Sequence, residues 1–154
     1  MSDRSAEEAR NEAAFRRLIE QGFSRGDTGV VDEVFAEDFV EHQSGIQPPG
    51  REGVKAAIAF LHRAFPDLRV LVQDLTVAGD KVWAHLVARG THEGHGFGEP
   101  TGRRIEIDIM DLCRFQDGQI VEHWGVPDRF AQMQQLGLLG SPEQRGEPAR
   151  PLTP

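Results

Sequence analysis

The alternation of apolar and polar residues is strongest in the C-terminal third of the chain. From 105 to 109 every second residue is isoleucine, and acidic residues stand between the isoleucines. A period of two is typical of a strand with one buried face. The run Gln-Asp-Gly-Gln at 116–119 separates this segment from a second apolar run at 120–126. The pattern predicts a long β-hairpin.

The remaining periodicity divides the chain into helices followed by strands. Apolar residues recur at helical spacing in four segments, which predicts helices at about 6–24, 30–35, 54–65 and 129–139. Pro66 ends the third of them. Period-two segments predict a short strand at 39–42 and longer strands at 68–77, 82–91, 103–115 and 120–126. Helices followed by consecutive antiparallel strands indicate an α+β fold.

Composition narrows the class of protein. The 154 residues, 38% of them hydrophobic, match one domain with one core, which we expect to span residues 1–140. Residues 141–154 hold four prolines among polar residues and predict a flexible tail. The net charge of −8, without a dense cluster of Lys and Arg, argues against nucleic-acid and membrane partners.

Cysteine content and the N-terminus predict the compartment. One cysteine cannot form an internal disulfide, and the first residues are charged where a secretory signal would be apolar. No apolar run approaches the roughly 20 residues that a membrane-spanning helix needs. We therefore expect a cytoplasmic protein.

Two titratable residues share the face of the hairpin that the isoleucines define. Alternation places on this face Asp111 and Cys113 of one strand, and Val121, His123 and Gly125 of the other. An apolar wall raises the pKa of an aspartate above about 3.9, so that it can exchange protons with an imidazole near neutral pH. Asp111 and His123 are therefore candidates for a general acid/base pair, or for a buried hydrogen bond between strands.

The hairpin resembles a known family. Its pattern Asp-Leu-Cys-Arg-Phe-x-Asp-Gly-x-Ile-Val-Glu-His-Trp-x-x-x-Asp at 111–128 is similar to the last hairpin of SnoaL-like polyketide cyclases, in the NTF2-like superfamily. Phe-Pro-Asp-Leu at 65–68, Gly-Thr-His-x-Gly at 90–94 and Pro-Thr-Gly at 100–102 extend the likeness. The resemblance implies an NTF2-like cone, with N-terminal helices packed on a curved antiparallel sheet around a cavity.

The resemblance also bears on the catalytic acid. In the cyclases an aspartate removes a proton α to a carbonyl, and the matching position here is Gly125. A cavity histidine of the family falls on Asp111, so the acidic function has either moved across the cavity or been lost. Asp128 is a possible second acid, although we favour a role as the cap of the helix that starts at Arg129.

Other histidines are candidates for substrate binding. His42 matches a place where the superfamily often has a polar cavity residue, and a solvent-exposed strand-end histidine is the alternative. His92 continues the inner face of its predicted strand. Together with His95 these residues lack the spacing of a metal site, and we predict no metal. The remaining residues expected to contact substrate are Ile109, Cys113 and Gly125.

The leading interpretation is a cofactor-independent SnoaL-like enzyme that acts on a hydrophobic carbonyl or polyketide-like small molecule. Asp111 would remove a proton α to a carbonyl while His123 or His92 polarises the oxygen, giving cyclisation or isomerisation. Epoxide or ester hydrolysis, with Asp111 activating a water, is one alternative. A non-catalytic ligand-binding or dimerisation module is another, favoured by the glycine at 125. We also expect a homodimer through the outer sheet face, at Trp83, Val87, Met110, Leu112 and Trp124.

Overall fold

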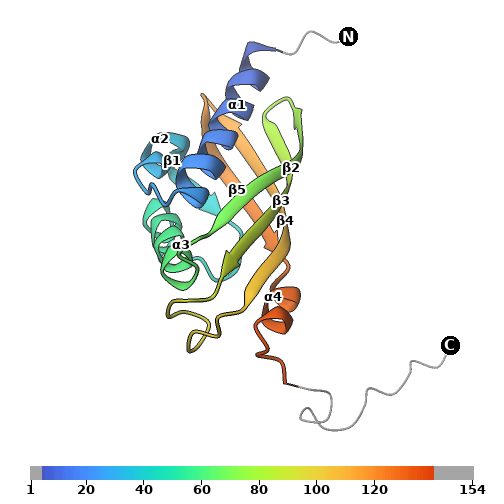
Figure 1. Ribbon diagram of the computed structural model, residues 1–154. Helices are drawn as coiled ribbons and strands as arrows, with labels where there is room; N and C mark the ends of the chain where they lie inside the picture. The colour runs from blue at the N-terminus through green and yellow to red at the C-terminus, as the bar shows by residue number, and fades with distance from the viewer. Residues whose placement is uncertain (1–4, 141–154) are drawn as a thin grey trace, which may run out of the picture.

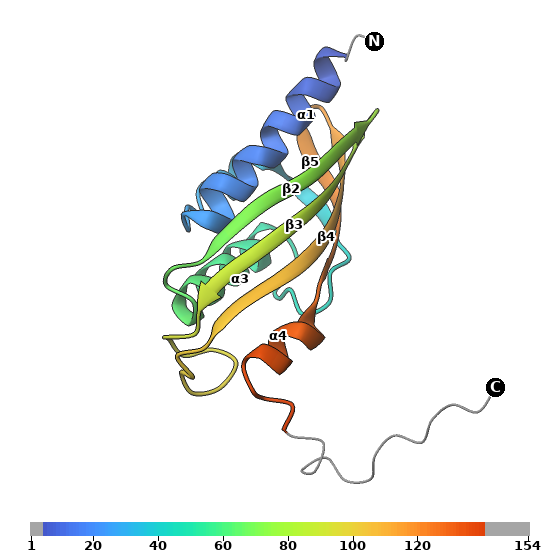
Figure 2. The ribbon, with the colours of Figure 1, turned by 45° about the vertical axis from the view of Figure 1, so that its right-hand side comes forward.

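The computed structural model describes residues 5–140, and the predicted tail at 141–154 lies outside them. Helices cover one face of a curved five-stranded sheet, as Figures 1 and 2 show. The helices are α1 (Ala6–Arg17), the π-helix η1 (Leu18–Ser24), α2 (Val30–Val34), α3 (Arg51–Ala64) and α4 (Arg129–Gln135). The strands are β1 (Phe35–Glu41), β2 (Arg69–Ala78), β3 (Lys81–Thr91), β4 (Arg104–Gln116) and β5 (Gln119–Pro127). The α+β prediction is confirmed.

The N-terminal helices follow their sequence signals closely. Ser5 and Glu8 form a complete capping box, in which each side chain accepts a hydrogen bond from the other residue's backbone N–H. The predicted helix over 6–24 has the right extent, but from Leu18 onward it is a π-helix. The next helix was predicted to reach residue 35, which is wrong by one residue because Phe35 is extended and begins β1.

The sheet has the strand order β1-β5-β4-β3-β2. Strands β2 to β5 pair antiparallel, as predicted, through the turns at 79–80 and 117–118. Strand β1 adds to the edge in parallel with β5, a pairing that the sequence pattern did not reveal. A parallel neighbour needs a long connection, and α3 together with β2, β3 and β4 supplies it here. This edge pairing sets Glu41 beside His123.

A β-bulge corrects one predicted inward residue. The register of β4 and β5 shifts between Arg114 and Phe115, so that Phe115 pairs with Ile120. Ile120 is therefore fully buried, whereas Val121, which alternation placed inward, is only partly buried. Beyond the bulge the predicted alternation returns, and His123 pairs with Cys113.

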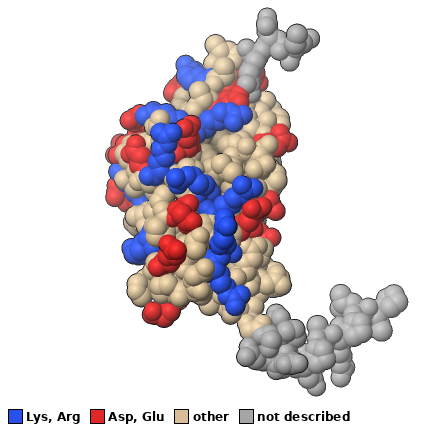
Figure 3. Space-filling view, viewed as in Figure 1, with Lys and Arg blue, Asp and Glu red and all other residues tan. Residues whose placement is uncertain are grey.

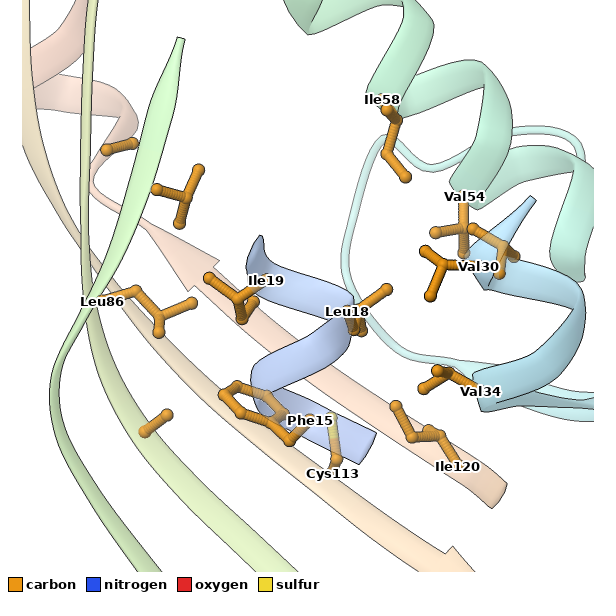
Figure 4. Close-up of a cluster of buried hydrophobic side chains, with 14 of the residues drawn as sticks. Phe15, Leu18, Ile19, Val30, Val34, Val54, Ile58, Leu86, Cys113 and Ile120 are labelled. Atoms are coloured by element: carbon orange, nitrogen blue, oxygen red, sulfur yellow. The ribbon is translucent and has the colours of Figure 1, made fainter. Parts of the chain in front are cut away.

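One core fills the space between the helices and the inner face of the sheet. Figure 4 shows side chains from α1, η1, α2, α3 and the sheet that meet in it, including Phe15, Ile58 and Leu86. Each large apolar side chain buried in this way contributes about 1.5–3 kcal/mol through removal from water. The core fixes the positions of the strands from which the polar residues described below project.

Candidate active site

A cavity of about 760 Å³ lies beside this core, between the sheet and α3. That volume is in the range of small-molecule sites. Its sheet side includes Leu86, Ala88, Ile105, Ile107 and Ile109. Its other walls come from η1, α3, the loop at 43–47, Phe97 and the first residues of α4. Ile109 therefore lies where the sequence predicted a substrate contact.

Three polar side chains meet at one part of the cavity wall and form what we call the inner cluster: Glu41, Asp111 and His123. His123 Nδ1 lies 2.7 Å from Glu41 Oε1, and its Nε2 lies 3.5 Å from Asp111 Oδ1. The side chains of His123, Glu41 and Asp111 are only 13%, 7% and 12% exposed. The predicted convergence of Asp111 and His123 is thus present, with a second carboxylate on the other side of the ring.

Glu41 is the member of the inner cluster that sequence reasoning missed. It comes from the last position of β1, directly beside His123 of β5. A signal existed, because Phe39 is buried and Glu41 is two residues later on the same strand, so both point inward. The backbone N–H of Gln43 donates a further hydrogen bond, 2.8 Å long, to Glu41 Oε1. That bond holds the carboxylate toward the imidazole.

The two carboxylates decide the charge of His123. Burial by itself lowers the pKa of this imidazole, but the hydrogen bonds and negative charges of Asp111 and Glu41 outweigh burial and raise the pKa from 6.5 to about 10. The ring therefore carries a proton on each nitrogen at neutral pH and donates on both sides. A histidine in this state is a hydrogen-bond donor and an acid. It has no free lone pair with which to act as a base.

Gly125 of β5 pairs with Asp111 of β4 and is therefore next to the inner cluster. A Cβ atom at this position would be 2.0 Å from Gln43 Oε1 and 2.9 Å from Asp111 Oδ1. The carboxamide of Gln43 therefore occupies the space into which any side chain at 125 would project. Gln43 lines the cavity, whereas Gly125 does not.

His42 points away from the cavity. It directly follows Glu41, the last residue of β1, and its backbone N–H still donates to the carbonyl of His123 at 2.9 Å, so its side chain projects to the opposite face of the sheet. There its Nε2 lies 2.9 Å from Glu122 Oε2, and its ring stacks on Trp124 with centroids 4.5 Å apart. Arg114 binds the other oxygen of the same glutamate at 2.6 Å, so His42, Glu122 and Arg114 form an outer cluster. The prediction that His42 contacts substrate is not supported by this geometry, because strand alternation turns it outward.

His92 is fully buried and holds the loop between β3 and β4 in place. Its Nε2 donates to the carbonyl of Gly96 at 2.6 Å, and its Nδ1 lies 3.1 Å from the hydroxyl of Thr101. Both ring nitrogens are thus occupied within the loop, and the ring packs against Phe65 with centroids 5.5 Å apart. His92 does not line the cavity, so the idea that it polarises a substrate oxygen finds no support here.

The surroundings of Cys113 and Asp128 favour roles in the fold over contact with a substrate. Cys113 is fully buried among the core side chains of Figure 4, and it does not line the cavity. Burial, with Asp111 and Glu41 nearby, raises the pKa of its thiol well above the usual value, so it stays a thiol. The Asp128 side chain accepts a 2.9 Å hydrogen bond from the backbone N–H of Ala131 and caps α4. The cap that we favoured for Asp128 is confirmed.

The described residues have neither the ligand cluster of a metal site nor a helix suited to cross a membrane. Within residues 5–140, no group of three or more His, Cys, Asp and Glu side chains is arranged to hold a metal ion. In the same part of the chain, no helix is both long and apolar enough to cross a membrane.

Comparison with known proteins identifies the family of the chain. The family model of SnoaL-like polyketide cyclases matches residues 13–136. The aklanonic acid methyl ester cyclase DnrD of Streptomyces peucetius is 32% identical over 129 residues, covering 79% of this chain and 87% of that protein. The nogalonic acid methyl ester cyclase of Streptomyces nogalater is 30% identical over 120 residues, covering 75% and 89%.

Solved structures agree with the sequence comparison. IdmH of Streptomyces antibioticus matches with a TM-score of 0.73 at 37% identity, covering 82% of this chain and 98% of that one. A SnoaL-like protein of Jannaschia sp. CCS1 matches with a TM-score of 0.80 at 29% identity, covering 92% and 100%. The chain therefore belongs to the SnoaL-like polyketide cyclase family and is a cyclase-like enzyme.

Proposed function

We propose that this protein is a cofactor-independent cyclase in which Asp111 is the base for an intramolecular aldol-type ring closure. The observation that carries the proposal is the inner cluster, where one imidazole lies between two nearly buried carboxylates in the wall of a cavity. The raised pKa of His123 keeps the ring protonated and so leaves proton abstraction to a carboxylate. Asp111 has the role in preference to Glu41, because Glu41 accepts short hydrogen bonds from both His123 and the backbone of Gln43, whereas Asp111 lies 3.5 Å from His123 and has no backbone donor within residues 5–140.

The reaction balances without an external reagent. Asp111 takes a proton from the carbon α to a carbonyl, and the electron pair of that C–H bond becomes an enolate. The enolate carbon attacks a second carbonyl of the same molecule, forming one C–C bond and an alkoxide. The alkoxide then takes a proton back, so the product is an isomer of the substrate. The His123 imidazolium stabilises the negative charge as it develops, because it is a donor in a site with little water.

The printed names of the relatives suggest the first substrates to test. Wild-type protein should be incubated with aklanonic acid methyl ester and with nogalonic acid methyl ester in D2O, and products followed by mass spectrometry. The proposal expects deuterium at the reacting α-carbon and a cyclised product with the composition of the substrate. Incorporation of 18O from labelled water would instead indicate hydrolysis. Binding without exchange or turnover would favour a binding module, the alternative that Gly125 raised.

We also propose that the protein is a homodimer through the outer face of the sheet. Trp83 and Met110 lie on that face and are 52% and 55% exposed, and exposed apolar patches often mark protein interfaces. Leu112 and Trp124 lie on the same face and are partly buried. Val87 was expected to contribute but is only 8% exposed, so it is already covered within one chain. Light scattering at micromolar concentration should give the mass of two chains, and a Trp83→Glu variant should give one.

A further inference from the structure

We infer that the cavity selects substrates that carry a carboxylate at the end remote from the inner cluster, and that Arg129 and Arg63 bind this group. The inference deepens the proposed function and rests on it only for the reaction. It begins with two arginines among the cavity-lining residues, one at the start of α4 and one near the end of α3.

Some arginines within residues 5–140 have an acidic partner, but these two do not. Within residues 5–140 neither Arg63 nor Arg129 forms an ion pair. Arg129 Nη1 donates only to the neutral amide of Gln132, at 2.7 Å. By contrast, Arg16, Arg25 and Arg114 each bind a glutamate at 2.8 Å or less. The positive charges of Arg63 and Arg129 are therefore available to a ligand.

Aromatic rings hold the two guanidinium groups at the cavity. Arg63 Cζ lies 5.5 Å from the ring centroid of Phe60, and Arg129 Cζ lies 5.7 Å from that of Phe97. The two phenylalanine rings pack edge to face with centroids 5.0 Å apart, and both line the cavity. Arg63, Phe60, Phe97 and Arg129 are therefore linked by successive contacts and form one continuous surface. A planar ligand can stack on its aromatic rings.

This surface lies away from the inner cluster along the sheet. Helix α4 begins beside β4 at Asp108, whose carbonyl accepts a 2.9 Å hydrogen bond from the backbone N–H of Asp128, and the loop that carries Phe97 leads into β4 at Arg104. Figures 1 and 2 show α4 and this loop at the same end of the sheet. Asp111 is three residues farther along β4 than Asp108, about 10 Å at the usual rise of a strand. A ligand several fused rings long spans that distance.

The charges of the lining favour an anion. At neutral pH, Arg63, Arg129 and protonated His123 supply three positive charges to the cavity wall, and Glu41 and Asp111 supply two negative ones. The whole chain has a net charge of −8, so the cavity opposes the overall sign of the molecule. On the outer surface seen in Figure 3, by contrast, Lys and Arg lie among Asp and Glu. An arginine fork fits a carboxylate better than an uncharged ester, because it donates two parallel hydrogen bonds.

Binding of a matched acid and ester tests the inference without relying on catalysis. Anthraquinone-2-carboxylate and its methyl ester should be titrated into wild-type protein and followed by calorimetry. We expect the acid to bind at least about tenfold more tightly than the ester, with a preference that weakens as salt increases. Arg129→Gln should remove most of the preference and Arg63→Gln part of it. Arg25→Gln, which removes an arginine paired with Glu20 outside the cavity lining, is the control and should leave the preference unchanged.

Each result separates this inference from the proposed function. Equal binding of acid and ester, failure of both to bind, or a preference that survives in the Arg129→Gln/Arg63→Gln double variant would overturn the carboxylate site. Asp111→Asn should keep the preference for the acid. If the preference is present but no substrate shows α-proton exchange, the anion site stands and the proposed reaction is wrong.

Discussion

Two histidine–glutamate pairs lie on opposite faces of the sheet where the end of β1 meets β5, and the pairs behave differently. His123 and Glu41 face the cavity with side-chain exposures of 13% and 7%, whereas His42 and Glu122 face outward at 37% and 24%. The carboxylates beside the inner histidine raise its pKa to about 10. The outer contact instead lowers the pKa of Glu122, chiefly through hydrogen bonds from His42 and Arg114. The same residue types therefore differ in their electrostatics because burial strengthens the interaction of the inner pair, and only the inner pair adjoins the cavity.

The largest expected difference in turnover between substitutions on the cavity face and on the outer face of the sheet concerns Asp111. Asp111→Asn should lower α-proton exchange and cyclisation by about 10²- to 10⁴-fold, because the amide keeps the shape but cannot accept the proton. Asp108→Asn is the matched control, since Asp108 is on the same strand but pairs with His85 on the outer face at 2.7 Å. Turnover measured on one batch of substrate compares the two variants. Full activity of Asp111→Asn would exclude Asp111 as the base.

The next largest loss of turnover is expected when Glu41 is changed. Glu41→Gln should remove one negative charge from His123, lower its pKa and cut turnover by about ten- to a hundredfold, as expected for a group that positions a catalytic one. Glu122→Gln makes the same change on the outer face and should leave turnover unaltered. The pH–rate profile distinguishes positioning from a merely structural role, because only loss of the inner carboxylate should move its alkaline limb toward neutral pH. Identical profiles for the two variants would contradict the comparison.

Gly125 tests how tightly the inner site is packed. Gly125→Asp would restore an acid at the position that matches the family's catalytic aspartate, but its Cβ would meet Gln43 Oε1 at 2.0 Å and Asp111 Oδ1 at 2.9 Å. We expect a loss of about 1–3 kcal/mol in unfolding free energy, measured in urea, from this overpacking and the added carboxylate. Gly125→Ala should show the steric part alone, and a second substitution, Gln43→Ala, should recover most of that part. An unchanged stability in both Gly125 variants would show that Gln43 moves freely.

The smallest effect is expected on the outer face. His42→Ala should change unfolding free energy by no more than about 1 kcal/mol, because a polar contact this exposed is well screened by solvent. Its stacking on Trp124 adds a contact that the same denaturation experiment would register. A loss well above that size would show that the outer cluster contributes more to the fold than its exposure indicates.

Much of this contrast was readable in the sequence. The alternation along β4 placed Asp111 inward, and the turn at Asp117-Gly118 brought His123 to the same face. Glu41 was missed because its role depends on the parallel pairing of β1 with β5, a contact between segments about eighty residues apart. His42 was assigned to the cavity by likeness alone, although its position next to an inward residue turns it outward.

Other features were beyond pattern reasoning. The bulge at Phe115 that buries Ile120 in place of Val121 changes the local alternation without a distinctive residue type. The contact of Gln43 with the space above Gly125 depends on the path of the 43–47 loop, which periodicity does not describe. The arginines that line the cavity were likewise invisible, because only the packing of α3 and α4 brings Arg63 and Arg129 to one ligand site.

The protonation of His123 tests the central claim most directly. With a folded pKa of about 10 against 6.5 when unfolded, the ring contributes stability that is fully present below about pH 6.5 and is lost as the pH rises through 10. NMR of ring-labelled histidine, with His123→Gln to assign the resonance, follows this proton without any substrate. We predict that His123 remains protonated on both nitrogens at pH 8 and titrates only well above it. Titration of this ring near pH 6.5 would contradict the account.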